Sequence, residues 1–393
     1  MAEQILIEDY NYHLPESSIA QHAAEPRDSS RLLMYNAGAI SDYRFKDIVS
    51  LLPEGSALFM NNAKVIPARI ILKNRNGARI EIFLLQPYNS DHVTALNAAT
   101  SCEWECLIGN SKKWKADEIL EIHVGKTRLS IERSAANRVC FNWEDGLAFV
   151  HILEAFGKLP LPPYIHHEAD DSDLERYQTV YAKVSGSVAA PTAGLHFSDE
   201  VFASLDEAGV KRHYLTLHVS AGTFLPVKVS DANEHVMHSE VFSASTELIK
   251  ALIETENVIA VGTTSCRVIE SLYQLAVNLK SGVENPFSIE QFSYRKTERL
   301  LSRKEAMMYL LSYMEERDLT EISGSTSIMI APGYRFMGID GLITNFHQPG
   351  STLLLLISAF IGDDWRSLYE HALNKGYRFL SYGDSSLLIP GIR

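Results

Sequence analysis

The chain is poor in cysteine, which excludes a disulfide-stabilised scaffold. Four cysteines are scattered over 393 residues, too few and too far apart for such a framework. Cys102 and Cys106 lie four residues apart, but no second pair accompanies them. Because a structural zinc site needs about four ligands, we expect no metal to bind there.

Positive charge is also in short supply. The chain holds 36 Lys and Arg against 49 Asp and Glu, a formal net charge of −13 at pH 7. So acidic a chain repels nucleic acid on average, and any RNA contact must use a local basic patch. The densest basic run is "SKKWK" at 111–115, which fits a solvated loop as well as an RNA contact.

Long apolar runs are missing too. The longest, "LLLLISAFIG" at 353–362, is shorter than the about 20 residues of a membrane span and indicates a buried helix. The first residues, "MAEQILIEDY", are acidic and lack the basic and apolar regions of a signal peptide. We therefore expect a cytoplasmic protein without membrane association. A monomer is a separate expectation that these features do not establish. Its hydrophobic content of 46% is ample for a large core.

Residues 57–155 are rich in short β-branched runs separated by turn residues, which predicts a small barrel or sandwich. A short helix ending near Gly157 and a proline-rich stretch at 159–165 follow, and we interpret them as a domain junction.

The second half of the chain alternates strand-like and helical runs. Helices are predicted after the strand at 257–262 and over 351–362. This alternation predicts an α/β fold with a mixed sheet. The charged segment 280–325, with a helix at 303–316, is expected to be an added surface element. The other predicted strands cover 211–219, 327–333, 338–344 and 377–384.

Polar and glycine-rich residues follow the predicted strands. His218, Val261, Ile343 and Phe379 lead into "SAGTF", "GTTS", "TNFHQPGST" and "SYGD". The stretch around His196, "VAAPTAGLHF", has the same composition. Because open α/β sheets bind ligands beyond the carboxyl ends of their strands, we expect these segments to converge on one pocket.

Two of these motifs have alternative interpretations. The start of the helix in "VGTTSCR" (261–267) suits a carboxylate or phosphate, yet Thr264 or Ser265 can equally be a plain helix cap. In "HVMHSE" (235–240), His235, His238 and Glu240 have spacing that could hold a metal. No strand or helix period brings all three together, so a loop with polar contacts is favoured.

The longer motifs together resemble the S-adenosylmethionine:tRNA ribosyltransferase-isomerase family. They occur in family order between residues 12 and 384. The matching stretches include "YHLPESSIAQ", "RDSSRLL", "VIPAR", "LPLPPYI", "ERYQTVYA", "VAAPTAGLHF", "TLHVSAGTF", "HVMHSE", "AVGTTSCRVIES", "LITNFHQPGSTLLLLISAF" and "YRFLSYGD".

The resemblance implies a reaction and a domain arrangement. The ribosyl unit of S-adenosylmethionine passes to the aminomethyl group of a 7-deazaguanine base at the tRNA wobble position. The product is epoxyqueuosine, and adenine and methionine are released. The implied partners are tRNA and S-adenosylmethionine, with no further cofactor and no metal. The implied fold is an α/β domain interrupted by a β-barrel-like domain. In this chain we expect the α/β domain at 1–64 and 157–393 and the inserted domain at 65–156.

Histidine suits the proton transfers of this reaction, because it titrates near neutral pH. A base must take a proton from the ribose carbon beside the sulfonium, and an acid must protonate the departing adenine. The candidates are His196 and His347, with His218 and His238 as reserves, and sequence does not distinguish acid from base. Glu240 or Asp384 is expected to orient a histidine or offset the sulfonium charge.

The candidate substrate-binding residues come from the same motifs. Aromatic residues are expected to face the sulfonium or stack on adenine, and hydroxyls at a helix start to hold an anion. These candidates are Thr192, Gly194, Phe197, Gly222, Thr223, Phe224, Thr263, Thr264, Ser265, Arg267, Asn345, Phe346, Ser351, Thr352 and Tyr382.

Two other functions remain as alternatives. An S-adenosylmethionine-dependent RNA methyltransferase would use the same co-substrate, although its usual glycine-rich first loop is not evident. A non-catalytic tRNA-binding relative is the second alternative, and the intact histidine and threonine motifs argue against it.

Overall fold

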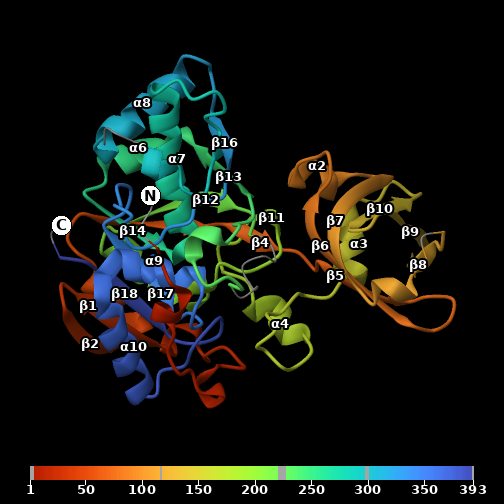
Figure 1. Cartoon of the computed structure of the whole chain (residues 1–393), viewed down its shortest axis with the longest axis horizontal. Helices are drawn as coiled ribbons and strands as arrows, with labels where there is room; N and C mark the ends of the chain where they lie inside the picture. Colours follow the sequence, from red (N-terminus) through yellow and green to blue (C-terminus); the bar gives the residue numbers. More distant parts are fainter. Residues whose placement is uncertain (1–3, 116, 220–226, 297–300, 392–393) are drawn as a thin grey trace.

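The computed structural model describes residues 4–115, 117–219, 227–296 and 301–391, and it contains two large sheets (Figure 1). The larger sheet has ten strands in the order β15-β16-β13-β12-β3-β14-β17-β18-β1-β2. In that order the strands are Ser288–Ile289, Glu321–Thr326, Glu240–Ser245, Lys211–Leu217, Ser56–Asn61, Asn257–Val261, Gly341–Asn345, Ser385–Ile389, Arg31–Asn36 and Ala39–Arg44.

The centre of this sheet is parallel and its flanks are mixed. Strands β12, β3, β14 and β17 are parallel neighbours, so their carboxyl ends lie at one edge. Strand β18 is antiparallel to β17, and β1 is parallel to β18. The prediction of an α/β fold with a mixed sheet is therefore confirmed.

Alternate residues of the central strands point to opposite faces, and helices cover both. On one face, Val258 and Ala260 pack in the main core with α6 (Thr246–Glu254), α7 (Gly262–Lys280), α9 (Thr352–Ile361) and α10 (Trp365–Asn374). On the other face, Ile259 and Val261 pack with α1 (Ile48–Leu51) and α5 (Asp199–Glu207). Helices α7 and α9 confirm two predicted helices, and the hydroxyl of Ser351 caps α9.

The second sheet has six antiparallel strands in the order β5-β6-β7-β10-β9-β8. Its two edge strands, β5 and β8, contact each other, so the sheet is a nearly closed barrel, as predicted. Trp104, Phe141 and Phe149 are fully buried in its core. In sheet order the strands are Arg69–Lys73, Arg79–Pro87, Ser101–Gly109, Arg138–Trp143, Thr127–Ala135 and Leu120–Val124.

The barrel stands beside the ten-stranded sheet (Figure 1). Helices α2 (His92–Asn97) and α3 (Phe149–Phe156) belong to this part. The chain enters and leaves it side by side, because Arg69 and Lys158 exchange backbone hydrogen bonds of 3.1 and 2.7 Å. Nearby, β4 (Ala63–Val65) and β11 (Val184–Ser187) form a two-stranded sheet, and α4 covers Asp171–Arg176. The division at 65 and 156 remains a prediction.

Two predicted strands are wrong. The run at 327–333 forms no strand. Ile328, Met329 and Ile330 are buried, but β16 has already ended at Thr326. An apolar run alone does not distinguish a buried strand from a buried segment without regular structure.

The stretch 377–384 is a turn that precedes β18 rather than a strand. The Asp384 carboxylate accepts hydrogen bonds from the backbone N–H groups of Arg378 (2.8 Å) and Arg31 (2.9 Å). These bonds close the chain into the turn. For 338–344, the strand is confirmed but begins only at Gly341.

Segment 280–325 differs from a surface addition, because it completes the sheet and part of the core. It contains β15, β16 and the expected helix, α8 (Arg303–Glu315). Ala306, Met307 and Leu310 of α8 are buried in the main core, where α8 packs on α6 and α7. On α8 the charged Lys304 and Glu305 are exposed, whereas Ala306, Met307 and Leu310 face inward. None of the described helices is both long enough and apolar enough to cross a membrane.

Candidate functional site

A cavity lies at the carboxyl edge of the parallel strands, where four of the predicted segments meet, and Ser381 of "SYGD" is among its lining residues. After β14, the first turn of α7 contributes Gly262, Thr263 and Thr264 to the cavity wall. After β17, the wall includes 344–348. Thr192, from the 3-10 helix Thr192–His196, closes another side. The structure thus brings these segments together at the edge where α/β sheets bind ligands.

His347 lines this cavity and is held firmly by its backbone. Its N–H donates to the Tyr369 hydroxyl (3.1 Å), and its carbonyl accepts from the Tyr12 hydroxyl. Its Nε2 lies 2.9 Å from the Thr344 hydroxyl. Burial lowers the pKa of His347 to about 3, so the ring is neutral at pH 7. A neutral imidazole in a fixed position can accept a proton.

His196 lies behind the cavity wall rather than on it. Its Nε2 is 3.2 Å from Asn345 Nδ2, and its Nδ1 is 2.8 Å from the Ser30 hydroxyl. The Asn345 Nδ2 also faces the carbonyl oxygens of Leu380 and Asp384, which fixes the amide orientation. Nε2 of His196 therefore accepts, and Nδ1 carries the proton.

Asn345 connects His196 to the cavity. Its Oδ1 accepts from the Thr192 hydroxyl (3.1 Å), and both residues line the cavity. Burial lowers the pKa of His196 to about 4, although the charge of Asp384 opposes this shift. His196 is thus a neutral, doubly hydrogen-bonded ring that orients the Asn345 amide. Asp384 does not line either of the two cavities described for this site, and its carboxylate holds the turn that precedes β18.

The first turns of α7 supply hydroxyls and one cation. Thr263, Thr264 and Arg267 line the cavity, whereas the Ser265 hydroxyl donates to the Val261 carbonyl inside the helix (2.7 Å). The residue at the N-cap position of α7 is Val261, whose side chain cannot accept a hydrogen bond. The first backbone N–H groups of α7 therefore receive no cap from it. Of the hydroxyls predicted at this helix start, Thr263 and Thr264 face the cavity.

A second cavity adjoins the first, and the "HVMHSE" motif lies on it. Its wall includes His235, His238 and Glu240, and it shares Arg267 and Ser351 with the first cavity. Glu240 is buried and forms a salt bridge with Arg267. The motif's carboxylate is thus engaged with a cation of the protein. Thr352 also lines this second cavity.

Several predicted site residues lie elsewhere. His218 stacks on His92 of α2 (ring centroids 4.5 Å apart), and burial lowers the pKa of His218 to about 4. Phe197 packs edge-on against Phe45 in the core. Gly194 is buried so tightly that an added Cβ would lie 2.0 Å from the Tyr181 hydroxyl. Phe346 does line the first cavity. Gly222, Thr223 and Phe224 lie outside the described residues.

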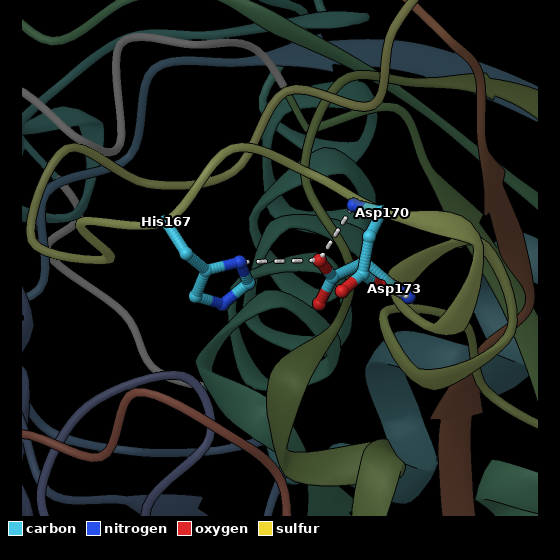
Figure 2. A group of neighbouring side chains, drawn as sticks. All are labelled: His167, Asp170 and Asp173. Carbon is cyan, nitrogen blue, oxygen red and sulfur yellow. Dashed lines mark hydrogen bonds and ion pairs between the residues drawn. The ribbon is translucent and has the colours of Figure 1, made fainter.

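Tyr382 lines neither of the two cavities and lies instead beside a cluster of His167, Asp170 and Asp173. Figure 2 shows the three residues of this cluster. The Tyr382 hydroxyl donates to Asp173 (2.6 Å). Both ring nitrogens of His167 face backbone carbonyl oxygens, those of Glu168 (3.0 Å) and Gln21 (3.1 Å). Nitrogens that donate to carbonyls are not available to bind a metal.

Charge and helix capping account for this cluster. Burial tends to lower the pKa of His167, but the bonds to Glu168 and Gln21 and the charge of Asp173 raise it overall. Asp170 and Asp173 form the capping box at the start of α4. The cluster therefore stabilises the protonated His167 and the beginning of this short helix.

Some residues on the first cavity were not among the predicted site residues. Tyr164 and Tyr177 line it, with Gln348 and Ser381. The Tyr164 hydroxyl lies 2.6 Å from that of Ser381. Both tyrosines belong to motifs already noted, "LPLPPYI" and "ERYQTVYA". These two motifs could have indicated the tyrosines, but neither motif follows a predicted strand, and the site was predicted from the strand ends.

A family model and three curated relatives all match this chain over almost its full length. The family model described as "Queuosine biosynthesis protein" matches residues 7–388. Relatives named S-adenosylmethionine:tRNA ribosyltransferase-isomerase are found in Zymomonas mobilis (39% identical over 97% of this chain and 98% of theirs) and Trichlorobacter lovleyi (36%, 98% and 100%). A third, in Pelobacter propionicus, is 37% identical over 98% of this chain and 100% of its own.

A solved structure of an S-adenosylmethionine tRNA ribosyltransferase from Thermotoga maritima is 25% identical, with a TM-score of 0.47. It covers 97% of this chain and 100% of its own. The family match spans nearly the whole chain, from before β1 to within β18. The chain therefore belongs to the queuosine biosynthesis protein family.

Proposed function

We propose that this chain is an S-adenosylmethionine:tRNA ribosyltransferase-isomerase. The observation that carries the proposal is the full-length similarity to three relatives of that name, at 36–39% identity. The reaction moves the ribosyl unit of S-adenosylmethionine to a 7-aminomethyl-7-deazaguanine base in tRNA and isomerises it. Epoxyqueuosine forms, and adenine and methionine leave.

His347 is the group that we assign to proton transfer. It is the histidine that lines the first cavity in the part of the chain that the structure describes, and it is neutral at pH 7. Its ring takes the proton from the ribose carbon that the sulfonium acidifies. The imidazolium formed then returns a proton to the departing adenine, so one residue serves both steps in turn.

His196 has a positioning role in this proposal rather than a catalytic one. Both of its ring nitrogens are already hydrogen-bonded, and Asn345 separates it from the cavity. By holding the Asn345 amide it also holds the Thr192 hydroxyl, since the two are hydrogen-bonded. Asn345, Thr192 and Phe346 then form the wall against which the substrate packs.

The domains, the location and the cofactors of the protein are part of the same proposal. The α/β part, at 1–64 and 157–393, carries the chemistry, and the barrel at 65–156 is an inserted domain. The protein acts in the cytoplasm as a monomer, with S-adenosylmethionine as its co-substrate and no other cofactor. Retained activity after treatment with a chelator is expected, and loss of activity would point to a metal instead.

An assay of released products tests the function directly. Purified protein is incubated with S-adenosylmethionine and tRNA that carries the deazaguanine precursor. Free adenine and methionine are the expected products. S-adenosylhomocysteine would identify a methyltransferase instead, and binding of tRNA without either product would identify a non-catalytic relative.

A further inference from the structure

Arg267 is a buried cation, and one nitrogen of its guanidinium has no hydrogen-bond partner among the described residues. Its side chain leaves the second turn of α7 and lies on the wall shared by the two cavities. Its Nε donates to the Ile328 carbonyl (3.3 Å), and its Nη1 donates to the Glu240 carboxylate. Within the described ranges, Nη2 has no hydrogen-bond partner, although the residue is only 5% exposed.

A second buried donor lies on the same face of the helix. Thr264 precedes Arg267 by three residues, a spacing that places two side chains next to each other on a helix. Its hydroxyl is buried and has no partner among the residues that the structure describes. Because buried polar groups are nearly always hydrogen-bonded, two such donors beside one cavity indicate an acceptor that binds there.

The start of α7 favours an anion as that acceptor. Thr263 and Thr264 belong to the first turn, where backbone N–H groups have no partner within the helix and the helix dipole is positive. Arg267 contributes the unpartnered Nη2 of its guanidinium, which can donate a charge-assisted hydrogen bond to a carboxylate. Glu240 holds that guanidinium in place but does not occupy Nη2.

We infer that Arg267, Thr264 and the first turn of α7 bind the α-carboxylate of the methionine part of S-adenosylmethionine. The inference rests on the proposed function and specifies which part of the co-substrate this site recognises. A tRNA phosphate is the other anion of the reaction. Arg267 is too deeply buried for a polynucleotide backbone to reach it, whereas the carboxylate at the end of a small, flexible chain can enter the cavity.

Decarboxylated S-adenosylmethionine, which lacks only this carboxylate, tests the inference. KM is measured for adenine release with each donor, in the wild type and in variants. The wild-type KM is expected to be about 10- to 100-fold higher for the decarboxylated donor, the usual range for a hydrogen bond to a charged group. In Arg267→Lys, which keeps a charge beside Glu240 but loses Nη2, this ratio should fall to a few-fold.

Thr264→Val provides a second, milder test, since it removes one hydroxyl and no charge. It should reduce the ratio by about 2- to 10-fold, because only one of several donors to the carboxylate is lost. If Arg267→Lys does not fold, this variant decides the question. Arg212→Met is the matched control, because Arg212 pairs with Asp206 and lines neither of these two cavities, and its ratio should equal that of the wild type.

The results that would overturn the inference differ from those against the function. Equal KM values for the two donors in the wild type, or an unchanged ratio in both Arg267→Lys and Thr264→Val, would contradict the carboxylate site alone. A higher KM for tRNA in Arg267→Lys with an unchanged donor ratio would assign the site to a phosphate. Absence of any adenine release by the wild type would instead contradict the proposed function.

Discussion

The barrel and the ten-stranded sheet differ in how many polar side chains they bury. The six-stranded barrel encloses an almost entirely apolar core that includes Trp104 and Phe141. Its buried polar side chains hold turns, as Asn74 does by accepting hydrogen bonds from the N–H groups of Asn76 and Ala78. The ten-stranded sheet has an equally apolar core, but its carboxyl edge also buries polar side chains of several elements.

The difference indicates where chemistry takes place in this molecule. Buried polar groups are costly unless they are hydrogen-bonded, and the barrel largely avoids them. At the edge of the large sheet His196, His347, Asn345 and Arg267 are all buried. Two side-chain donors there, Nη2 of Arg267 and the Thr264 hydroxyl, have no partner among the described residues. Both residues line the first cavity. Four predictions test this contrast, from the largest expected effect to the smallest.

Replacing the cavity histidine should affect activity most. In His347→Gln the base is lost while a polar side chain remains, and turnover in adenine release should fall by about 10²- to 10⁴-fold, the usual contribution of an acid–base residue. His218→Gln is the control, since His218 stacks on His92 away from both cavities. A fall of less than threefold in His347→Gln would remove His347 from the proposed chemistry.

Replacing a core aromatic residue of the barrel should instead affect stability. Phe141 is fully buried, so Phe141→Ala should lower the free energy of unfolding by about 3–5 kcal/mol. Adenine release per folded molecule should change little. Leu107→Ala is the control, because Leu107 is 48% exposed on β7 and should cost less than about 0.5 kcal/mol. A selective loss of turnover in folded Phe141→Ala would show that the barrel also shapes the catalytic site.

The buried histidines should make stability depend on pH. The folded pKa values of His196 and His347 are about 4 and about 3, below the ordinary value of about 6.5. Between these values the unfolded chain binds more protons than the folded one. Stability should therefore be full above pH 6.5 and fall by several kcal/mol as the pH drops towards 4, since lowering a pKa by one unit contributes about 1.4 kcal/mol.

Denaturant unfolding at several pH values checks this dependence. His196→Gln removes one of the titrating groups, so its stability should fall less steeply between pH 6.5 and 4. An unchanged slope in this variant would mean that His196 is not buried in its neutral form.

The smallest effect is expected at His196. If it only orients Asn345, His196→Ala should lower turnover by about tenfold, through misplacement of the cavity wall. His196→Gln offers a side-chain carbonyl to the Asn345 amide, and it should restore turnover to within threefold of the wild type. A loss as large as that in His347→Gln, without rescue by glutamine, would assign proton transfer to His196.

Much of the fold was predictable where the local signals agreed. The run "NVIAVG" and the helical spacing after it predicted β14 and α7, and Ser351 predicted the start of α9. The strands at 327–333 and 377–384 were wrong because short apolar or alternating runs look alike in strands and in packed loops. Only contacts with distant segments, such as Asp384 to the amide of Arg31, decide between them.

The candidate site was predictable as a set of segments, but the roles of its residues were not. His196 and His347 have the same kind of neighbours in sequence, with glycine, proline and threonine nearby. Their difference comes from partners far along the chain. Ser30 lies 166 residues from His196, and Asn345 lies 149 residues from it.

By itself, the sequence determined the family, the mixed α/β class with a barrel, and the sheet edge at which the polar segments meet. These depend on periodicity, on turn residues and on motifs, which are local properties of the chain. Only the tertiary structure decided which histidine reaches the cavity and which donor of Arg267 is left without a partner. Burial and hydrogen bonding depend on segments that come together only when the chain is folded.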